Sequence, residues 1–159
     1  MTSGQDPPHN PHDMSSLLSQ MIIGYRVSQA LYVAAKLGIA DLLQEGPKSR
    51  GELATATGVH PDALYRVLRA LASVGVFTEG EHGRFGLTPL AALLQTGVPG
   101  SLRALAIVMG EEPAWRPWGE LLYSVQTGLP AFEQVFGMPH SIVFSGRPMG
   151  FRDEEQLKP

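Results

Sequence analysis

The sequence has 159 residues, of which 43% are hydrophobic and 17% are charged, and its net charge is −3. This length is enough for one full domain, and the low charged fraction favours an apolar surface that a partner covers. The absence of cysteine excludes disulfides and thiolate metal sites, and the negative charge gives no general attraction to nucleic acid or to anionic lipid.

Residues 1–13 are polar and contain three prolines, so we expect them to be disordered. No apolar run follows a basic start, as a signal peptide would require. The most apolar region, residues 21–40, is interrupted by Arg26, Gln29 and Lys36, which argues against a membrane span. We therefore expect a cytoplasmic protein without a membrane partner.

Residues 14–37 are predicted to form one long helix with apolar residues on more than one side. Such a helix is buried on several sides, and one domain of this size can hardly cover it all. Packing across a two-fold axis would do so, which predicts a homodimer, although an ordinary core helix stays the alternative. The residues expected at the dimer interface are Leu17, Leu18, Met21, Ile22, Tyr25 and Leu31.

The segment 49–87 predicts a helix, a turn, a second helix and a hairpin. Ser49 and Glu52 have the spacing of a capping box, and Gly58 suits the end of that first helix. Pro61 fits the first position of the second helix, whose leucines recur at helical spacing. The strands 76–78 and 84–87 surround a short polar loop. This order is that of a winged helix-turn-helix.

Further helices are predicted at 89–94, 101–109 and 113–127, followed by a short apolar piece ending at residue 137. Met109, Trp115 and Trp118 are large apolar side chains that either line a small-molecule pocket or belong to a plain core. The fold class is therefore mainly α: a winged helix-turn-helix with a short β-hairpin, a long N-terminal helix and extra C-terminal helices. The expected regions are a winged-helix domain at 14–98, a helical extension at 99–137 and a disordered tail at 138–159.

No catalytic constellation is visible in the sequence. A glycine-rich turn between a strand and a helix, the usual cradle for a dinucleotide or a phosphate, does not occur, and no metal-ligand cluster is recognised. A winged helix suggests DNA binding, for which Arg50, Arg66, Arg69 and Arg84 could contact phosphates. The acidic residues at the predicted wing tip make this surface a poor match to DNA, so a packing role fits the charges better.

Several motifs together resemble the N-terminal domain of S-adenosylmethionine-dependent small-molecule O-methyltransferases, the acetylserotonin or caffeate type, and most nearly the actinobacterial enzymes of secondary metabolism. The motifs that carry the resemblance are the run 57–71, the run 85–89, the run 100–103, Trp115, Trp118, the run 127–132 and the run 135–137. The resemblance implies a winged helix that intertwines with its twin, with the first long helix as the main dimer element.

The resemblance also implies what this sequence lacks. Family members continue into a Rossmann-like domain with the cofactor turn and a histidine base, neither of which occurs here. The family pattern breaks after Gly137, which predicts a truncated and inactive chain that binds no cofactor by itself. A stand-alone dimerisation protein is the alternative to truncation. Met109, Trp115 and Trp118 correspond to part of the acceptor pocket, and an acceptor would bind only if a catalytic domain were supplied. The alternative hypothesis is a DNA-binding winged-helix transcriptional regulator.

Overall fold

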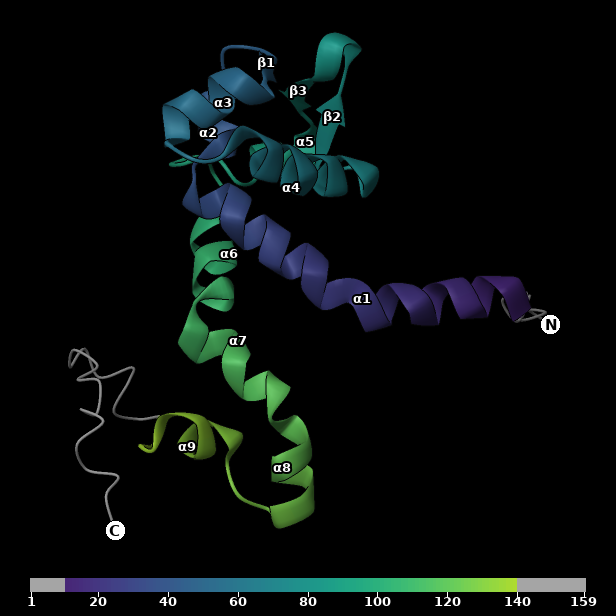
Figure 1. Cartoon of the computed structure of the whole chain (residues 1–159), viewed down its shortest axis with the longest axis vertical. Coiled ribbons are helices and arrows are strands. Elements are labelled where there is room, and N and C mark those ends of the chain that lie inside the picture. The colour runs from purple at the N-terminus through teal and green to yellow at the C-terminus, as the bar shows by residue number, and fades with distance from the viewer. Residues whose placement is uncertain (1–10, 140–159) are drawn as a thin grey trace, which may run out of the picture. The chain divides into compact units, whose positions relative to one another are not determined.

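The computed structural model describes residues 11–139, and the tails expected to be disordered lie outside this range except at their inner ends. The chain is mainly helical with a small antiparallel sheet, as predicted (Figure 1). It divides into two compact units, the first ending at Gly110 and the second beginning at Glu111. The elements of unit 1 are α1 (Pro11–Lys36), α2 (Ile39–Leu42), β1 (Lys48–Ser49), α3 (Arg50–Thr57), α4 (Pro61–Ser73), β2 (Phe77–Glu79), a 3₁₀ turn (Glu81–Gly83), β3 (Arg84–Leu87), α5 (Pro89–Ala92) and α6 (Arg103–Gly110).

Helix α1 begins at Pro11, so residues 11–13, expected to belong to a disordered tail, form its first turn. Its C-terminal end is fixed in the core, where Ala34 and Ala35 are each only 1% exposed. This end packs against α4 and α6, and small side chains allow the close approach. The N-terminal half of α1 extends away from the rest of unit 1 (Figure 1).

The winged helix has the predicted order of elements. The Ser49–Glu52 capping box is confirmed, because the Ser49 hydroxyl accepts from the Glu52 N–H and the Glu52 carboxylate accepts from the Ser49 N–H. Helix α4 starts at Pro61 as expected, and its N-cap is His60, whose Nδ1 accepts from the Asp62 N–H at 3.2 Å. The buried face of α4 consists of Leu64, Leu68 and Leu71.

The sheet has the strand order β1-β3-β2, and both pairs are antiparallel. The β2–β3 hairpin was predicted, whereas β1 was not, because two residues are too few to show an alternating pattern. Phe77 and Phe85 point into the core and are almost completely buried. The Thr88 hydroxyl donates to the Val76 carbonyl at 2.6 Å and accepts from the Ala91 N–H, which fixes α5 behind the hairpin.

Polar contacts fix α6 to the C-terminal end of α1, and the segment that leads into α6 to α2. Arg103 donates from Nε to the Ala35 carbonyl at 3.0 Å, and Asp41 accepts from both the backbone and the hydroxyl of Thr96 at 2.7 Å. The first compact unit includes α6 and ends at Gly110. The division at residue 98 into a winged-helix domain and a helical extension stays a prediction.

Unit 2 contains α7 (Glu112–Gly119), α8 (Leu121–Thr127) and α9 (Ala131–Phe136). The prediction of one helix over residues 113–127 is wrong, since the helix is interrupted at Glu120. Pro117 removes a backbone donor inside α7 and Gly119 lowers the helix propensity beside it, which explains the break. The core of this unit is small: Phe132 is buried, and its ring lies 4.7 Å from the ring of Phe136.

Candidate functional site

The N-terminal half of α1 carries a large apolar surface that the chain itself does not cover. Met21 is 69% exposed and Ile22 is 65% exposed, and the neighbouring apolar side chains of this half are similarly open. Five of the six residues predicted at the dimer interface belong to this surface: Leu17, Leu18, Met21, Ile22 and Tyr25. Contiguous exposed apolar surface of this kind marks interaction sites.

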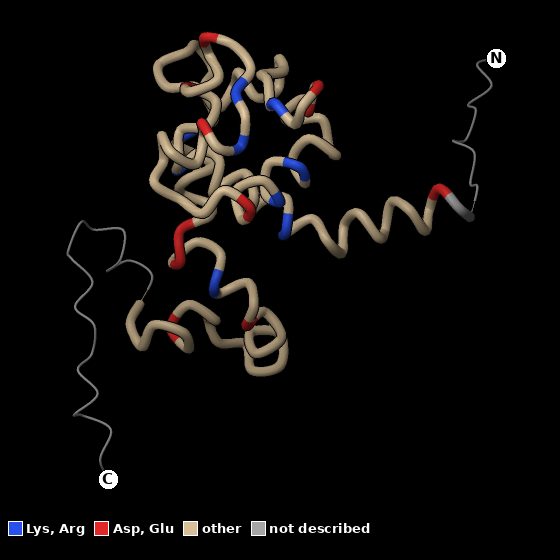
Figure 2. The backbone as a smooth tube through the Cα atoms, turned by 45° about the horizontal axis from the view of Figure 1, so that its top comes forward, with Lys and Arg blue, Asp and Glu red and all other residues tan. Residues whose placement is uncertain are grey.

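This surface is also free of charge. Residues 14–25 contain no acidic or basic side chain, and the first charges on either side are Asp13 and Arg26. Figure 2 shows this half of α1 as an uninterrupted tan helix between one red and one blue position. Without a charge to be desolvated, the surface can be buried at little electrostatic cost. No helix in the described part of the chain is long and apolar enough to cross a membrane.

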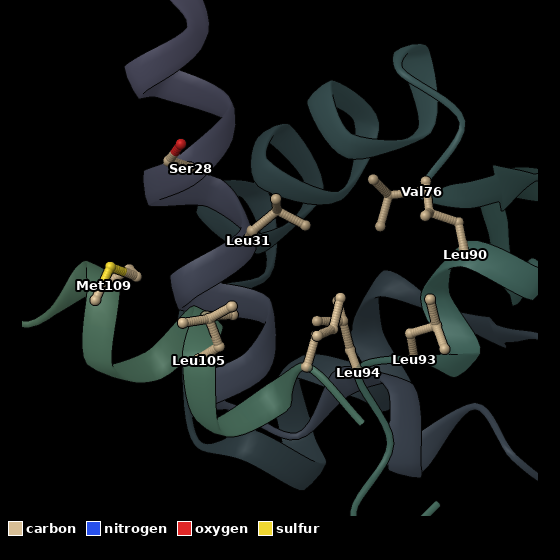
Figure 3. A pocket seen from close by; sticks show the side chains of 10 residues that line it. Ser28, Leu31, Val76, Leu90, Leu93, Leu94, Leu105 and Met109 are labelled. Carbon is tan, nitrogen blue, oxygen red and sulfur yellow. The ribbon is translucent and has the colours of Figure 1, made fainter. Parts of the chain in front are cut away.

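A second apolar feature of unit 1 is a groove of about 280 Å³ between α1, α5 and α6. Figure 3 shows its side chains directed toward a common space, with Ser28 and Met109 near one end. Ser28 is the one polar side chain among the residues that line it, and its hydroxyl donates to the Gly24 carbonyl at 3.4 Å. The other lining residues are Leu31, Val76, Leu90, Leu93, Leu94, Leu102, Leu105, Ala106 and Met109.

The sequence interpretation missed this groove. Leu102, Leu105 and Met109 are each about half exposed, and all three line the groove. Leu31, the sixth residue predicted at the dimer interface, is half-buried and belongs to the groove wall. Its place in a dimer interface stays a prediction. The available signal was the density of leucines between residues 90 and 105, which exceeds what one small core needs.

The three residues expected to contact an acceptor fall in different units. Met109 lies near the end of α6 in unit 1, and Trp115 and Trp118 lie on α7 in unit 2. Trp118 is 72% exposed, so it is not a core residue of its own unit. Trp115 is 46% exposed, so it is not a buried core residue either. The role of both tryptophans in acceptor binding stays a prediction.

Two of the four arginines considered for phosphate contact, Arg50 and Arg84, are engaged within the winged helix. Arg50 forms an ion pair with Asp62 at 3.2 Å and lies over the Tyr65 ring at 5.2 Å. Arg84 pairs with Glu52 at 3.1 Å and donates to the Pro47 carbonyl. These pairs reduce the positive charge that a phosphate backbone would meet.

The Glu52 carboxylate has the most perturbed acidity in this region. The hydrogen bonds that it receives from Ser49 lower the pKa of Glu52 to about 2, and the Arg84 guanidinium contributes in the same direction. This carboxylate faces water and is held by partners of its own chain, so its role is structural. Among the residues that the structure describes, no cluster of three potential metal ligands occurs.

A family model of the O-methyltransferase dimerisation domain matches residues 19–97. The matched segment comprises most of α1 and the whole winged helix. Among curated proteins, the phenazine O-methyltransferase PhzM of Lysobacter antibioticus is 59% identical over 124 residues, which are 78% of this chain and 36% of that protein.

Solved structures show the same relationship. The crystal structure of LaPhzM superimposes with a TM-score of 0.77 at 55% identity, covering 83% of this chain and 40% of that one. An O-methyltransferase of neocarzinostatin biosynthesis, solved with S-adenosylmethionine and 2-hydroxy-5-methyl naphthoic acid, gives a TM-score of 0.65 at 32% identity, covering 75% of this chain and 37% of that one. The chain thus spans roughly two fifths or less of the length of these relatives.

Proposed function

We propose that this chain, which carries an O-methyltransferase dimerisation domain over residues 19–97, forms a homodimer through the N-terminal half of α1. A dimerisation domain implies self-association, and the exposed surface of α1 supports this particular interface. The observation that carries the proposal is the run 14–25, which has no charged side chain and exposes most of its large apolar side chains. Obligate interfaces are more apolar than transient ones and commonly bury 2,000 Å² or more in total.

The test is the variant Ile22→Glu, studied by size-exclusion chromatography with light scattering. Ile22 is exposed in the single chain, so a glutamate there does not disturb the core of unit 1. In the dimer, however, this glutamate would be a buried charge without a partner, which costs several kcal/mol. We therefore expect the wild type at twice the chain mass of 17.1 kDa and the variant as a monomer or an aggregate.

The matched control is Ala63→Glu, which adds the same charge to an exposed position in the first turn of α4. A carboxylate in the first helical turn is electrostatically favourable, so this variant should fold. It should also keep the dimeric mass. A dimeric Ile22→Glu variant, or a monomeric wild type, would contradict the proposed interface.

We further propose that Met109 of unit 1 and, separately, Trp115 and Trp118 of unit 2 each contribute an acceptor contact in an O-methyltransferase-type protein. Two exposed tryptophans and a flexible methionine suit a flat aromatic acceptor, since stacking and adaptable apolar contact both favour it. The catalytic domain and S-adenosylmethionine would have to be supplied from outside the described residues. The structure of the neocarzinostatin relative, with its naphthoic acid, illustrates the class of acceptor.

A chimera tests this second part. The residues of this chain that match the Lysobacter enzyme would replace the corresponding segment there, because 59% identity favours correct packing. In that background, Trp118→Ala should raise KM for the phenazine acceptor several-fold while leaving KM for S-adenosylmethionine unchanged. An equal effect on both constants would point to a general folding defect and contradict the assignment.

A further inference from the structure

Residues 100–103, which lead into α6, are held by hydrogen bonds that fix where this helix begins. The Ser101 hydroxyl donates to the Gln95 carbonyl at 2.7 Å. The Leu102 N–H donates to the Leu93 carbonyl, also at 2.7 Å. Because Leu93 caps the C-terminal end of α5, the backbone ahead of α6 is held against that end.

Arg103, the first residue of α6, joins this helix to the C-terminal end of α1. Its Nε donates to the Ala35 carbonyl at 3.0 Å, and the same carbonyl accepts from the Gly38 N–H at 3.2 Å. The last carbonyls of a helix lack partners within the helix and form the negative end of its dipole, so a guanidinium is favoured there. The Asp41 carboxylate lies 4.0 Å from the same Nε and offsets its charge. A charge-assisted hydrogen bond therefore connects α6 to α1.

The other end of α6 rests on α1 through close packing. Gly110 is the last residue of the helix, and a Cβ at this position would overlap the Tyr32 side chain. A hydrogen bond prefers a nearly linear arrangement of its atoms, so the one made by Arg103 fixes a direction as well as a distance. The contacts at the two ends together determine how α6 lies on α1.

Met109 lies beside the Gly110 contact and depends on the orientation of α6. Without the Arg103 hydrogen bond, that contact would act as a pivot about which α6 could turn. A turn of about 20° would move the Met109 methyl group by roughly 2 Å, given a helix radius of ~5–6 Å with side chains. Figure 3 shows Leu105 and Met109 on this helix at the edge of the groove. Displacements of about 1 Å are enough to impair the positioning of a bound molecule.

We infer that Arg103 is a positioning residue, whose hydrogen bond to the Ala35 carbonyl orients α6 and thereby the Met109 side chain that meets an acceptor. This inference rests on the proposed acceptor contact of Met109 and adds how that contact is held in place. Arg103 is not among the residues that line the groove. It therefore acts on an acceptor through α6.

Arginine suits this position better than lysine. The planar guanidinium presents its N–H groups in fixed directions, so Arg103 can donate to the Ala35 carbonyl while its charge faces Asp41. A lysine ammonium is a point charge with rotatable donors on a flexible stem. Arg103→Lys should thus keep the attraction to the end of α1 but hold the direction of α6 less firmly.

The first test follows the Met109 methyl group by NMR in the full chain labelled with 13C-methyl methionine. The loss of one signal in Met109→Leu identifies it. Arg103→Leu removes the donor and the charge, and it should shift the Met109 signal by more than the line width while the Met14 signal stays in place. Arg103→Lys should give a smaller shift, and it carries the measurement if calorimetry shows that Arg103→Leu does not fold. The matched control is Arg69→Leu, the same change at an exposed position of α4, which should leave the Met109 signal unmoved.

The second test separates positioning from stability. In a chimera of the Lysobacter enzyme that contains residues 100–110 of this chain, Arg103→Leu should raise KM for the phenazine acceptor several-fold and leave KM for S-adenosylmethionine unchanged. Met109→Ala should show the same separation, and Arg103→Lys should recover most of the loss. A role in stability alone would reduce the amount of active enzyme and so the apparent kcat, without separating the two KM values.

Two results would overturn the inference. One is a Met109 signal that stays in place in Arg103→Leu. The other is an acceptor KM that is unchanged in Arg103→Leu although Met109→Ala raises it. An acceptor KM that is unchanged in Met109→Ala would instead refute the proposed acceptor contact, and the Met109 signal would still decide whether Arg103 orients α6.

Discussion

At the scale of single residues, the start of α3 is held by charge as well as by hydrogen bonds. Glu52 accepts from the Ser49 N–H at 2.7 Å and pairs with Arg84, which joins the helix start to β3. A carboxylate at a helix N-terminus is also stabilised by the helix dipole. These interactions favour the ionised form and explain why the pKa of Glu52 falls to about 2.

This lowered pKa predicts how the stability of the winged helix depends on pH. The folded-state pKa lies below the ordinary value of 4.5, so the stabilisation is complete above about pH 4.5 and is lost as the pH falls toward 2. We expect Glu52→Ala to lower Tm at pH 6 and to lower it much less at pH 3, measured by scanning calorimetry. The variant Glu52→Gln keeps a hydrogen-bond acceptor for the capping box but removes the charge. If the Tm difference between wild type and Glu52→Gln depends strongly on pH, the charge of Glu52 is its cause. An Ala variant with the same Tm deficit at both pH values would contradict this account.

Gly110 is required by close packing between α6 and α1. A Cβ at this position would lie 2.1 Å from Cγ of Tyr32, at the base of a side chain that cannot easily move aside. We expect Gly110→Ala to destabilise unit 1 by roughly 1–3 kcal/mol, the usual cost of overpacking, measured by urea unfolding. Gly119→Ala is the control, because its Cβ would meet nothing within 4 Å and should leave stability unchanged or improved. Equal stability of the two variants would contradict this prediction, because it would show that α6 moves to accommodate the added methyl group.

At the scale of elements, local signals predicted most of the winged helix and failed where contacts are distant. The capping box of Ser49, the proline at the start of α4 and the leucine spacing of α4 are all local, and each predicted feature is present. Strand β1 depends on pairing with β3, which lies some 35 residues further along the chain. No local sequence pattern therefore predicts it. The interruption at Glu120 was missed because the apolar spacing continues across it, although Pro117 and Gly119 signalled the break.

The groove shows the same division between local and distant information. Its wall combines residues of α1, α5 and α6 with Val76, and their apolar character is evident in the sequence. Their arrangement around one space is a property of the packed unit, which periodicity within each helix cannot reveal. The exposed half of α1 was predictable in outline, because an excess of apolar faces on one helix already indicated a missing partner.

At the scale of the whole molecule, the chain combines a firmly packed winged helix with apolar surfaces that it does not cover itself. Those of unit 1 lie on the N-terminal half of α1 and in the groove. Those of unit 2 include Trp118, Leu122 and Val125, which its small core around Phe132 leaves exposed. The matched relatives are longer than this chain. In proteins of that kind, the additional residues are available to contact surfaces such as these.

The last prediction concerns S-adenosylmethionine, which we expect this chain not to bind by itself. The cofactor carries a sulfonium, a carboxylate and ribose hydroxyls, and burying such groups requires matching charges and hydrogen-bond partners. The groove offers them one hydroxyl, and the acidic, glycine-rich turn of the resembled family does not occur in the sequence. Isothermal titration calorimetry should therefore give no saturable heat, with the Lysobacter phenazine O-methyltransferase as the positive control. A saturable isotherm with a micromolar Kd would contradict this prediction and would place a cofactor site on residues to which we assign none.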